Sequence, residues 1–101
     1  NRTDFYDFVN EIWRDLKINL ENEGRKFEKK NEKENGNTVS LIIEEFKSGK
    51  TVLFNLINED DLPPSIIFGQ LDSQNQEYVT LILDEENKKL LLEKVKNFFI
   101  N

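Results

Sequence analysis

Residues 38–58, TVSLIIEEFKSGKTVLFNLIN, constrain the fold of this chain more than any other stretch. Two runs rich in β-branched and aromatic residues flank residues 47–50, where Gly49 provides a turn signal, and this pattern predicts a β-hairpin. Because successive side chains of a strand point to opposite faces, every second residue should face the core. The residues predicted to do so are Val39, Leu41, Ile43, Val52, Phe54 and Leu56.

The other face of this hairpin has an intermediate character. Its residues are Ser40, Ile42, Glu44, Phe46, Thr51, Leu53, Asn55 and Ile57. Such a face is too apolar for plain contact with solvent and too polar for a sealed core. Two arrangements are therefore open. Helices packed on one face of the sheet would leave an apolar patch on the other, whereas helices on both faces would cover it.

An amphipathic helix is predicted before the hairpin, because apolar residues recur there with helical spacing. These residues are Phe5, Phe8, Val9, Ile12, Trp13, Leu16 and Leu20. Thr3 is the expected N-cap, and Gly24 is expected to end the helix because glycine readily adopts the left-handed conformation. Trp13 belongs to the apolar stripe, so core packing is favoured over a stacking platform for a ligand.

Residues 25–37, RKFEKKNEKENGN, contain Phe27 as their single apolar side chain. They either continue the helix and then form a loop, or form a charged edge strand that turns back at Asn35-Gly36. The composition favours a loop with a short edge strand. Basic and acidic residues alternate here without interleaved aromatics, so direct nucleic-acid binding is not expected.

A second hairpin is predicted after residues 59–64, EDDLPP, because proline cannot donate to a sheet ladder. Its strands are residues 66–71 and 78–83, separated by a polar loop. Asp84 should then cap a closing helix. The residues expected on or near the apolar face of that helix are Leu91, Leu92, Val95, Phe98 and Phe99.

Together these segments predict a single α+β domain over residues 1–101. It has an N-terminal helix, an antiparallel sheet of four strands in two hairpins, and a C-terminal helix. A fifth strand is added if residues 25–34 pair with the sheet.

The chain has 101 residues, no Cys and no His, and a net charge of −6. These absences remove thiolate nucleophiles, the usual general base at neutral pH and the commonest metal ligands, so no catalysis, cofactor or metal is expected. Residues 38–83 hold two basic and seven acidic side chains. This asymmetry favours a cationic partner over nucleic acid.

No apolar run approaches the length of a membrane span, and no secretory signal is evident, so a cytoplasmic location is expected. Because translated chains start with Met and this one starts at Asn1, its terminus is expected to have been processed.

Two motifs resemble ligand sites without meeting their requirements. Residues 48–51, SGKT, match the end of a phosphate-binding loop, but Glu44 stands where the first glycine is needed, and a strand follows. A plain hairpin turn is therefore predicted. Residues 59–61 lack the spacing of a calcium loop, which favours a solvated acidic loop. Glu44 and Glu45 should point to opposite faces of their strand and cannot act as a carboxylate pair.

The function expected from these features is that of a small acidic protein-binding module. Inhibitors, immunity proteins and anti-defence proteins that occupy the surface of a basic partner enzyme belong to this class. The alternative is a structural module that forms a homodimer through the half-apolar face of the sheet. The residues expected to bind the partner are Ile42, Glu44, Phe46, Leu53, Ile57, Glu59, Asp60, Asp61 and Tyr78, and Ile82 extends their apolar patch.

Overall fold

The computed structural model describes residues 2–35 and 38–100. Its elements are α1 (Arg2–Leu20), the 3-10 helix η1 (Glu21–Glu23), β1 (Phe27–Asn35), β2 (Thr38–Glu45), β3 (Thr51–Ile57), β4 (Ser65–Leu71), β5 (Gln76–Ile82) and α2 (Glu85–Ile100). The five strands form one antiparallel sheet in the order β1-β2-β3-β4-β5. The predicted α+β class is confirmed, with five strands in the sheet.

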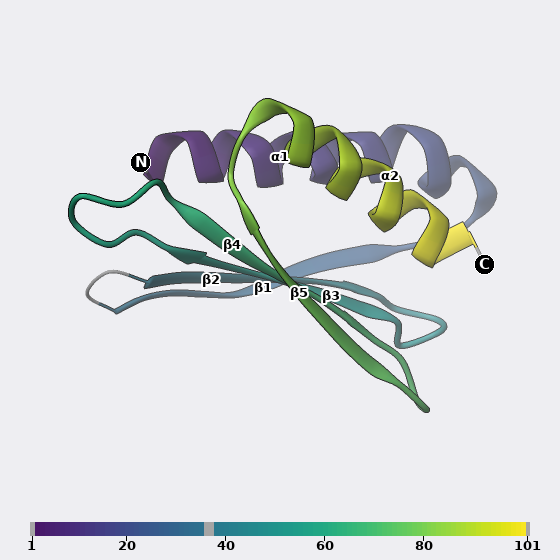
Figure 1. Ribbon diagram of the computed structural model, residues 1–101. Coiled ribbons are helices and arrows are strands. Elements are labelled where there is room, and N and C mark those ends of the chain that lie inside the picture. Colours follow the sequence, from purple (N-terminus) through teal and green to yellow (C-terminus); the bar gives the residue numbers. More distant parts are fainter. Residues whose placement is uncertain (1, 36–37, 101) are drawn as a thin grey trace.

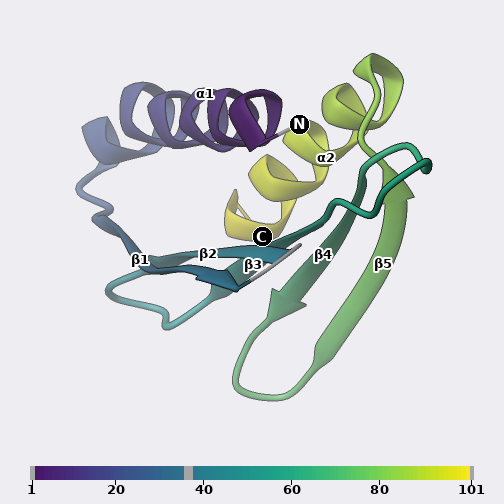
Figure 2. The same ribbon diagram turned by 90° about the vertical axis from the view of Figure 1, so that its left-hand side faces the viewer.

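Both helices lie on the same face of the sheet (Figures 1 and 2). The core fills the space between the two layers, and the hairpin residues predicted to face it are all buried. Phe54 lies near its centre, with ring centroids 6.1 Å from Phe8 of α1 and 5.4 Å from Phe68 of β4. Of the two arrangements that the sequence leaves open, the structure adopts the one that leaves the second face of the sheet uncovered.

The apolar stripe of α1 is buried as predicted, apart from Trp13, which is half-buried against the core. Lys17 Nζ lies 4.9 Å from the centroid of the Trp13 ring. The prediction of Thr3 as the N-cap is wrong, because the helix already includes Arg2. Gly24 ends the helical segment with φ +81°, the left-handed conformation expected there.

β1 is a nine-residue edge strand, longer than the short strand that the composition favours. Residues 27–35 form a strand because they pair with β2 and because Phe27 is buried. The Phe27 ring packs edge-on against that of Phe99, with the ring centroids 5.0 Å apart. The register of β1 shifts between Lys30 and Lys33, which marks a bulge. The predicted turn at Asn35-Gly36 lies partly outside the described residues.

The remaining turns and caps follow the sequence closely. Gly49 has φ +73°, as the predicted hairpin turn requires. Asp84 caps α2, since its Oδ1 accepts a hydrogen bond of 2.8 Å from the backbone N–H of Asn87. β5 ends at Ile82, one residue earlier than predicted.

The C-terminal end of α2 is held by cations from distant parts of the chain. Arg25 Nη1 donates to the carbonyl of Phe99 at 2.6 Å, and Lys50 Nζ donates to that of Phe98 at 2.9 Å. The last carbonyls of a helix lack intrahelical partners, and they favour positive charge nearby. The Arg25 guanidinium also pairs with the buried carboxylate of Glu45, with Nε 3.4 Å from Oε2.

Candidate functional site

The outer face of the sheet, on the side away from the helices, gathers several residues that the sequence singled out. Adjacent strands place Ile42 opposite Leu53, Leu53 opposite Gly69, and Gly69 opposite Tyr78. Three predicted partner-binding residues, Ile42, Leu53 and Tyr78, therefore stand in one row across β2 to β5, with Gly69 between the last two. All three are at least partly exposed.

Neighbouring rows add further apolar side chains to this face. Ile57 and Ile82 flank Ser65 in one row, and Ile67 lies between Asn55 and Thr80 in the next. Ile67 and Leu71 were not among the residues predicted for this site. The run around them is apolar at nearly every position, so only its register with β3 shows which side chains point outward.

Gly69 permits a close contact between Tyr78 and the sheet. A Cβ atom at this position would lie 2.7 Å from Tyr78 Cε1 and 2.9 Å from Cδ1. The aromatic ring therefore lies across the glycine, which is itself buried. Pairing an aromatic residue with a strand glycine in this way compensates for the missing side chain and fixes where the ring lies.

This contact predicts a strong coupling between Gly69→Ala and Tyr78→Ala. In the Tyr78→Ala background, Gly69→Ala should raise the free energy of unfolding by about 0.5–1 kcal/mol, because alanine loses less backbone entropy than glycine. With Tyr78 present, the same substitution should lower that free energy, because the ring must move. Denaturant unfolding of the four proteins measures the coupling energy, which we expect to reach about 1 kcal/mol. Additive effects would show that the ring does not lie on Gly69.

The charged side chains on the outer face lie at its β1 side and pair with one another. Lys30 Nζ is 2.8 Å from Glu44 Oε1 and 4.0 Å from Glu28 Oε2. The hydrogen bond to Glu44, together with the attraction of its charge, raises the pKa of Lys30 above its usual 10.5. Glu45 points to the other side of the sheet, as the strand alternation predicts. Its side chain is buried there. The outward positions of β3, β4 and β5 hold no charged residue.

The remaining predicted residues lie at opposite ends of β3. Phe46 is 76% exposed in the turn before this strand, and residues 59–61 lie in the β3–β4 loop after it. Within the described part of the chain, no cationic side chain pairs with Glu59, Asp60 or Asp61. Asp61 has φ +66°. The structure therefore does not join these acids to Phe46 in one compact site, but places them at the rim of the outer face.

A small hollow joins the acidic loop to the outer face. It has a volume of about 180 Å³ and is lined by Ile57, Glu59, Leu62, Pro63, Ser65 and Ile82. Leu62 and Ile82 are both largely exposed. Because a cavity of roughly 150 Å³ can hold a benzene molecule, this hollow has room for one apolar side chain.

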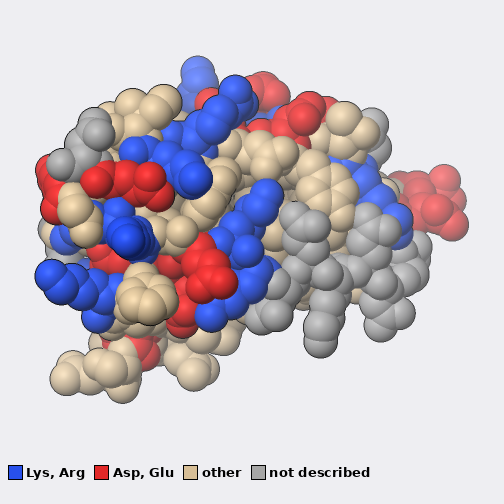
Figure 3. All heavy atoms as spheres, turned by 180° about the vertical axis from the view of Figure 1, so that it is seen from behind, with Lys and Arg blue, Asp and Glu red and all other residues tan. Residues whose placement is uncertain are grey.

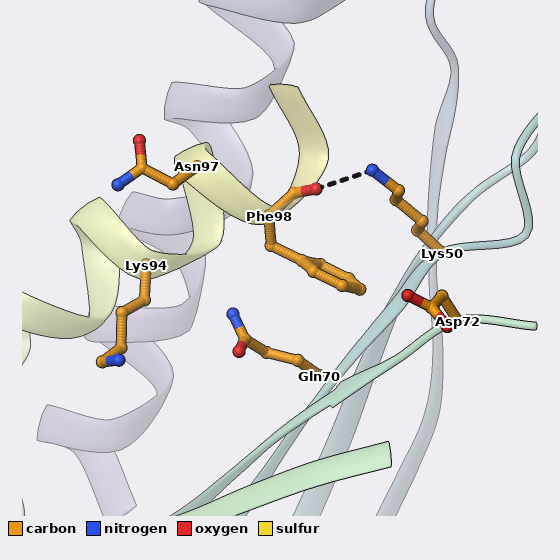
Figure 4. Close-up of a pocket in the computed structure, with 6 residues that line it drawn as sticks. All are labelled: Lys50, Gln70, Asp72, Lys94, Asn97 and Phe98. Carbon is orange, nitrogen blue, oxygen red and sulfur yellow. Dashed lines mark hydrogen bonds between the residues drawn. The ribbon is translucent and has the colours of Figure 1, made fainter. Parts of the chain in front are cut away.

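A wider hollow, of about 480 Å³, lies between α2 and the strand ends on the helix side (Figure 4). Two of its charged groups, Lys50 and Asp72, already serve the fold. Lys50 binds the Phe98 carbonyl, and Asp72 accepts hydrogen bonds of 2.8 and 2.7 Å from the backbone N–H groups of Gln74 and Asn75. These two bonds, followed by the attraction of Lys50, lower the pKa of Asp72 below its usual 3.8. We therefore assign this hollow to the packing of α2.

Neither a metal centre nor a membrane span is found in the described residues. No group of three or more acidic side chains among them could hold a metal ion. None of the helices they form is long and apolar enough to cross a membrane. No protein family, curated protein or solved structure matches the chain. The outer face of the sheet, with its acidic loop, is thus the candidate site that the geometry favours.

Proposed function

We propose that this protein is a binding module that occupies the surface of a basic partner protein through the outer face of its sheet. The observation that carries the proposal is the combination of a half-apolar face, uncharged at its outward positions on β3 to β5, with acidic residues at its rim that pair with no described cation. A role as an inhibitor, an immunity protein or an anti-defence protein agrees with this arrangement, because such proteins act by covering a surface.

The centre of the face has the character of a protein interface. Interface cores are depleted of charge and enriched in aromatic residues, while their rims are polar. Leu53, Ile67 and Tyr78 provide the apolar centre, and the outward positions of β3 to β5 hold no charge that would need to lose its water on contact. The hollow beside Ile57 offers a place for one apolar anchor of the partner.

The acidic loop supports a basic partner in particular. Glu59, Asp60 and Asp61 are exposed, and no described cation neutralises them. Most of the other acids of the sheet region differ, because Glu44 pairs with Lys30, Glu45 pairs with Arg25 and Asp72 binds its own turn. Complementary charges at the rim of an interface speed association and make it dependent on salt.

The test begins with capture of proteins from the native host on the immobilised chain, followed by affinity measurements on each purified candidate. Leu53→Lys should weaken binding of the true partner by at least about a hundredfold, since a charge placed in a desolvated interface centre costs several kcal/mol. Glu59→Lys combined with Asp60→Lys should weaken binding about tenfold at low salt and flatten its salt dependence.

Glu11→Lys combined with Glu93→Lys is the matched control, because it changes the net charge equally at two exposed helix positions. This control should leave the affinity nearly unchanged. Equal losses of affinity in the control and the loop variant would show that net charge alone causes the effect, and would contradict the assigned site. A dimer of this chain that buries Leu53 and excludes every other protein would also contradict the proposal.

A further inference from the structure

The two edges of the sheet differ in how they are protected. β1 carries Lys and Glu along most of its length and contains a bulge, both of which discourage pairing with another strand. Positive and negative side chains are intermixed on that side of the molecule (Figure 3). β5, with the sequence QEYVTLI, has Glu77 as its single charge and contains neither proline nor lysine. Six of its seven residues are exposed, and no described strand pairs with its outer edge (Figure 2).

The hydrogen-bond pattern shows which backbone groups of β5 point to this free edge. The N–H of Leu83 donates to the carbonyl of Pro64, and the N–H of Asp72 donates to that of Asn75. Residues that exchange hydrogen bonds alternate along an antiparallel ladder. Glu77, Val79 and Leu81 therefore bond to β4. The N–H and C=O groups of Gln76, Tyr78 and Thr80 point outward, as does the N–H of Ile82. The carbonyl of Ile82 is already bonded, because it accepts hydrogen bonds from the backbone N–H of Asp84 at 3.0 Å and from Asn87 Nδ2 at 2.8 Å.

We propose that two copies of this chain pair through β5, antiparallel about a two-fold axis at Val79, so that their sheets become continuous. This register overlaps the whole strand. Tyr78 then exchanges hydrogen bonds with Thr80 of the second copy, and the N–H of Ile82 donates to the carbonyl of Gln76 of the second copy. Apart from the N–H of Gln76, every free N–H and C=O group on this edge finds a partner, which is the condition that an exposed edge leaves unmet.

Side chains also suit this self-pairing. The two Val79 residues meet at the axis as a β-branched pair, a combination favoured between strands. Glu77 stands opposite Leu81 of the second copy, so the two Glu77 charges do not face each other. A second copy also presents a strand that is already formed and avoids the ordering cost of a flexible peptide. The assembly closes as a dimer, because both remaining edges are the charged, bulged β1 strands.

Cysteine cross-linking tests this geometry directly, because the chain has no Cys of its own. Opposite residues of a non-hydrogen-bonded pair have Cα atoms about 4.5 Å apart, which suits a disulfide. Val79→Cys should therefore form a covalent dimer under mild oxidation. Glu28→Cys on the other edge and Leu53→Cys on the outer face should not. A covalent dimer from Leu53→Cys but not from Val79→Cys would overturn the proposal in favour of face-to-face pairing.

Thr80→Pro tests the pairing by sedimentation from micromolar to millimolar protein. The substitution removes an N–H that points to the free edge and leaves the bonds to β4 in place, so the monomer should retain its circular dichroism spectrum. We expect the dissociation constant of the dimer to rise at least about tenfold, because each copy loses one hydrogen bond and presents a ring at the edge. Thr80→Lys is the second variant and should act likewise. A wild-type chain that stays monomeric at millimolar concentration would overturn the proposal.

Discussion

Arg25→Ala should lower the free energy of unfolding by about 3 kcal/mol or more, because it leaves a buried carboxylate without its cation. The side chain of Glu45 is 4% exposed, and that of Arg25 is 30% exposed. Apart from Arg25, the side-chain partner described for Glu45 is the hydroxyl of Ser48. The substitution also removes the hydrogen bond to the Phe99 carbonyl at the end of α2. Urea unfolding at neutral pH measures the loss.

Two variants show whether the buried charge causes this effect. Lys26→Ala removes a neighbouring exposed cation and should change the free energy of unfolding by no more than about 0.5 kcal/mol. Arg25→Met combined with Glu45→Leu replaces the pair by apolar side chains and should recover most of the lost stability. If Arg25→Ala costs less than about 1 kcal/mol, the ion pair does not neutralise a buried charge.

The strands β2 and β3 could be predicted because their two faces differ in burial. Period-two alternation places Val52 and Phe54 on the core side and Leu53 on the other, and the structure agrees. The closing helix was equally clear, since Asp84 supplies its cap and Leu91, Val95 and Phe99 recur with helical spacing. In both cases the information is local, so a single sequence is enough.

Local sequence information does not predict structure that depends on contacts between distant segments. β1 has one apolar residue, Phe27, and becomes a long strand because β2 offers it a partner and α2 places Phe99 over it. The contact of Arg25 with the end of α2 joins residues 74 positions apart. Composition cannot reveal either contact.

The candidate site was predictable in part for the same reason. Ile42 and Leu53 follow from the alternation of the first hairpin, but their alignment with Tyr78 depends on the register of three strand pairs. The contribution of Ile67 was hidden in an apolar run, and the role of Gly69 depends on the ring that lies across it. The acidic loop was recognised from its sequence, and the structure places it at the rim of this face.

Phe54→Ala should lower the free energy of unfolding by about 3–5 kcal/mol, because it removes a fully buried ring and leaves a cavity. The ring contacts Phe8 of α1 and Phe68 of β4, so its loss weakens the packing between the two layers. Urea unfolding, followed by the fluorescence of Trp13 and by circular dichroism, measures the change. Both probes should report the same transition if the domain unfolds as one unit.

Leu53→Ala is the matched comparison, since Leu53 precedes Phe54 on the same strand and points to the outer face. This substitution should lower the free energy of unfolding by no more than about 1 kcal/mol, because the half-buried Leu53 side chain buries a smaller apolar area. A comparable loss for both variants would mean that the outer face is itself sealed in solution and cannot be a free binding surface. A much smaller loss for Leu53→Ala than for Phe54→Ala would show that Leu53 contributes little to the stability of the fold. That result is expected of a residue whose role is contact with a partner.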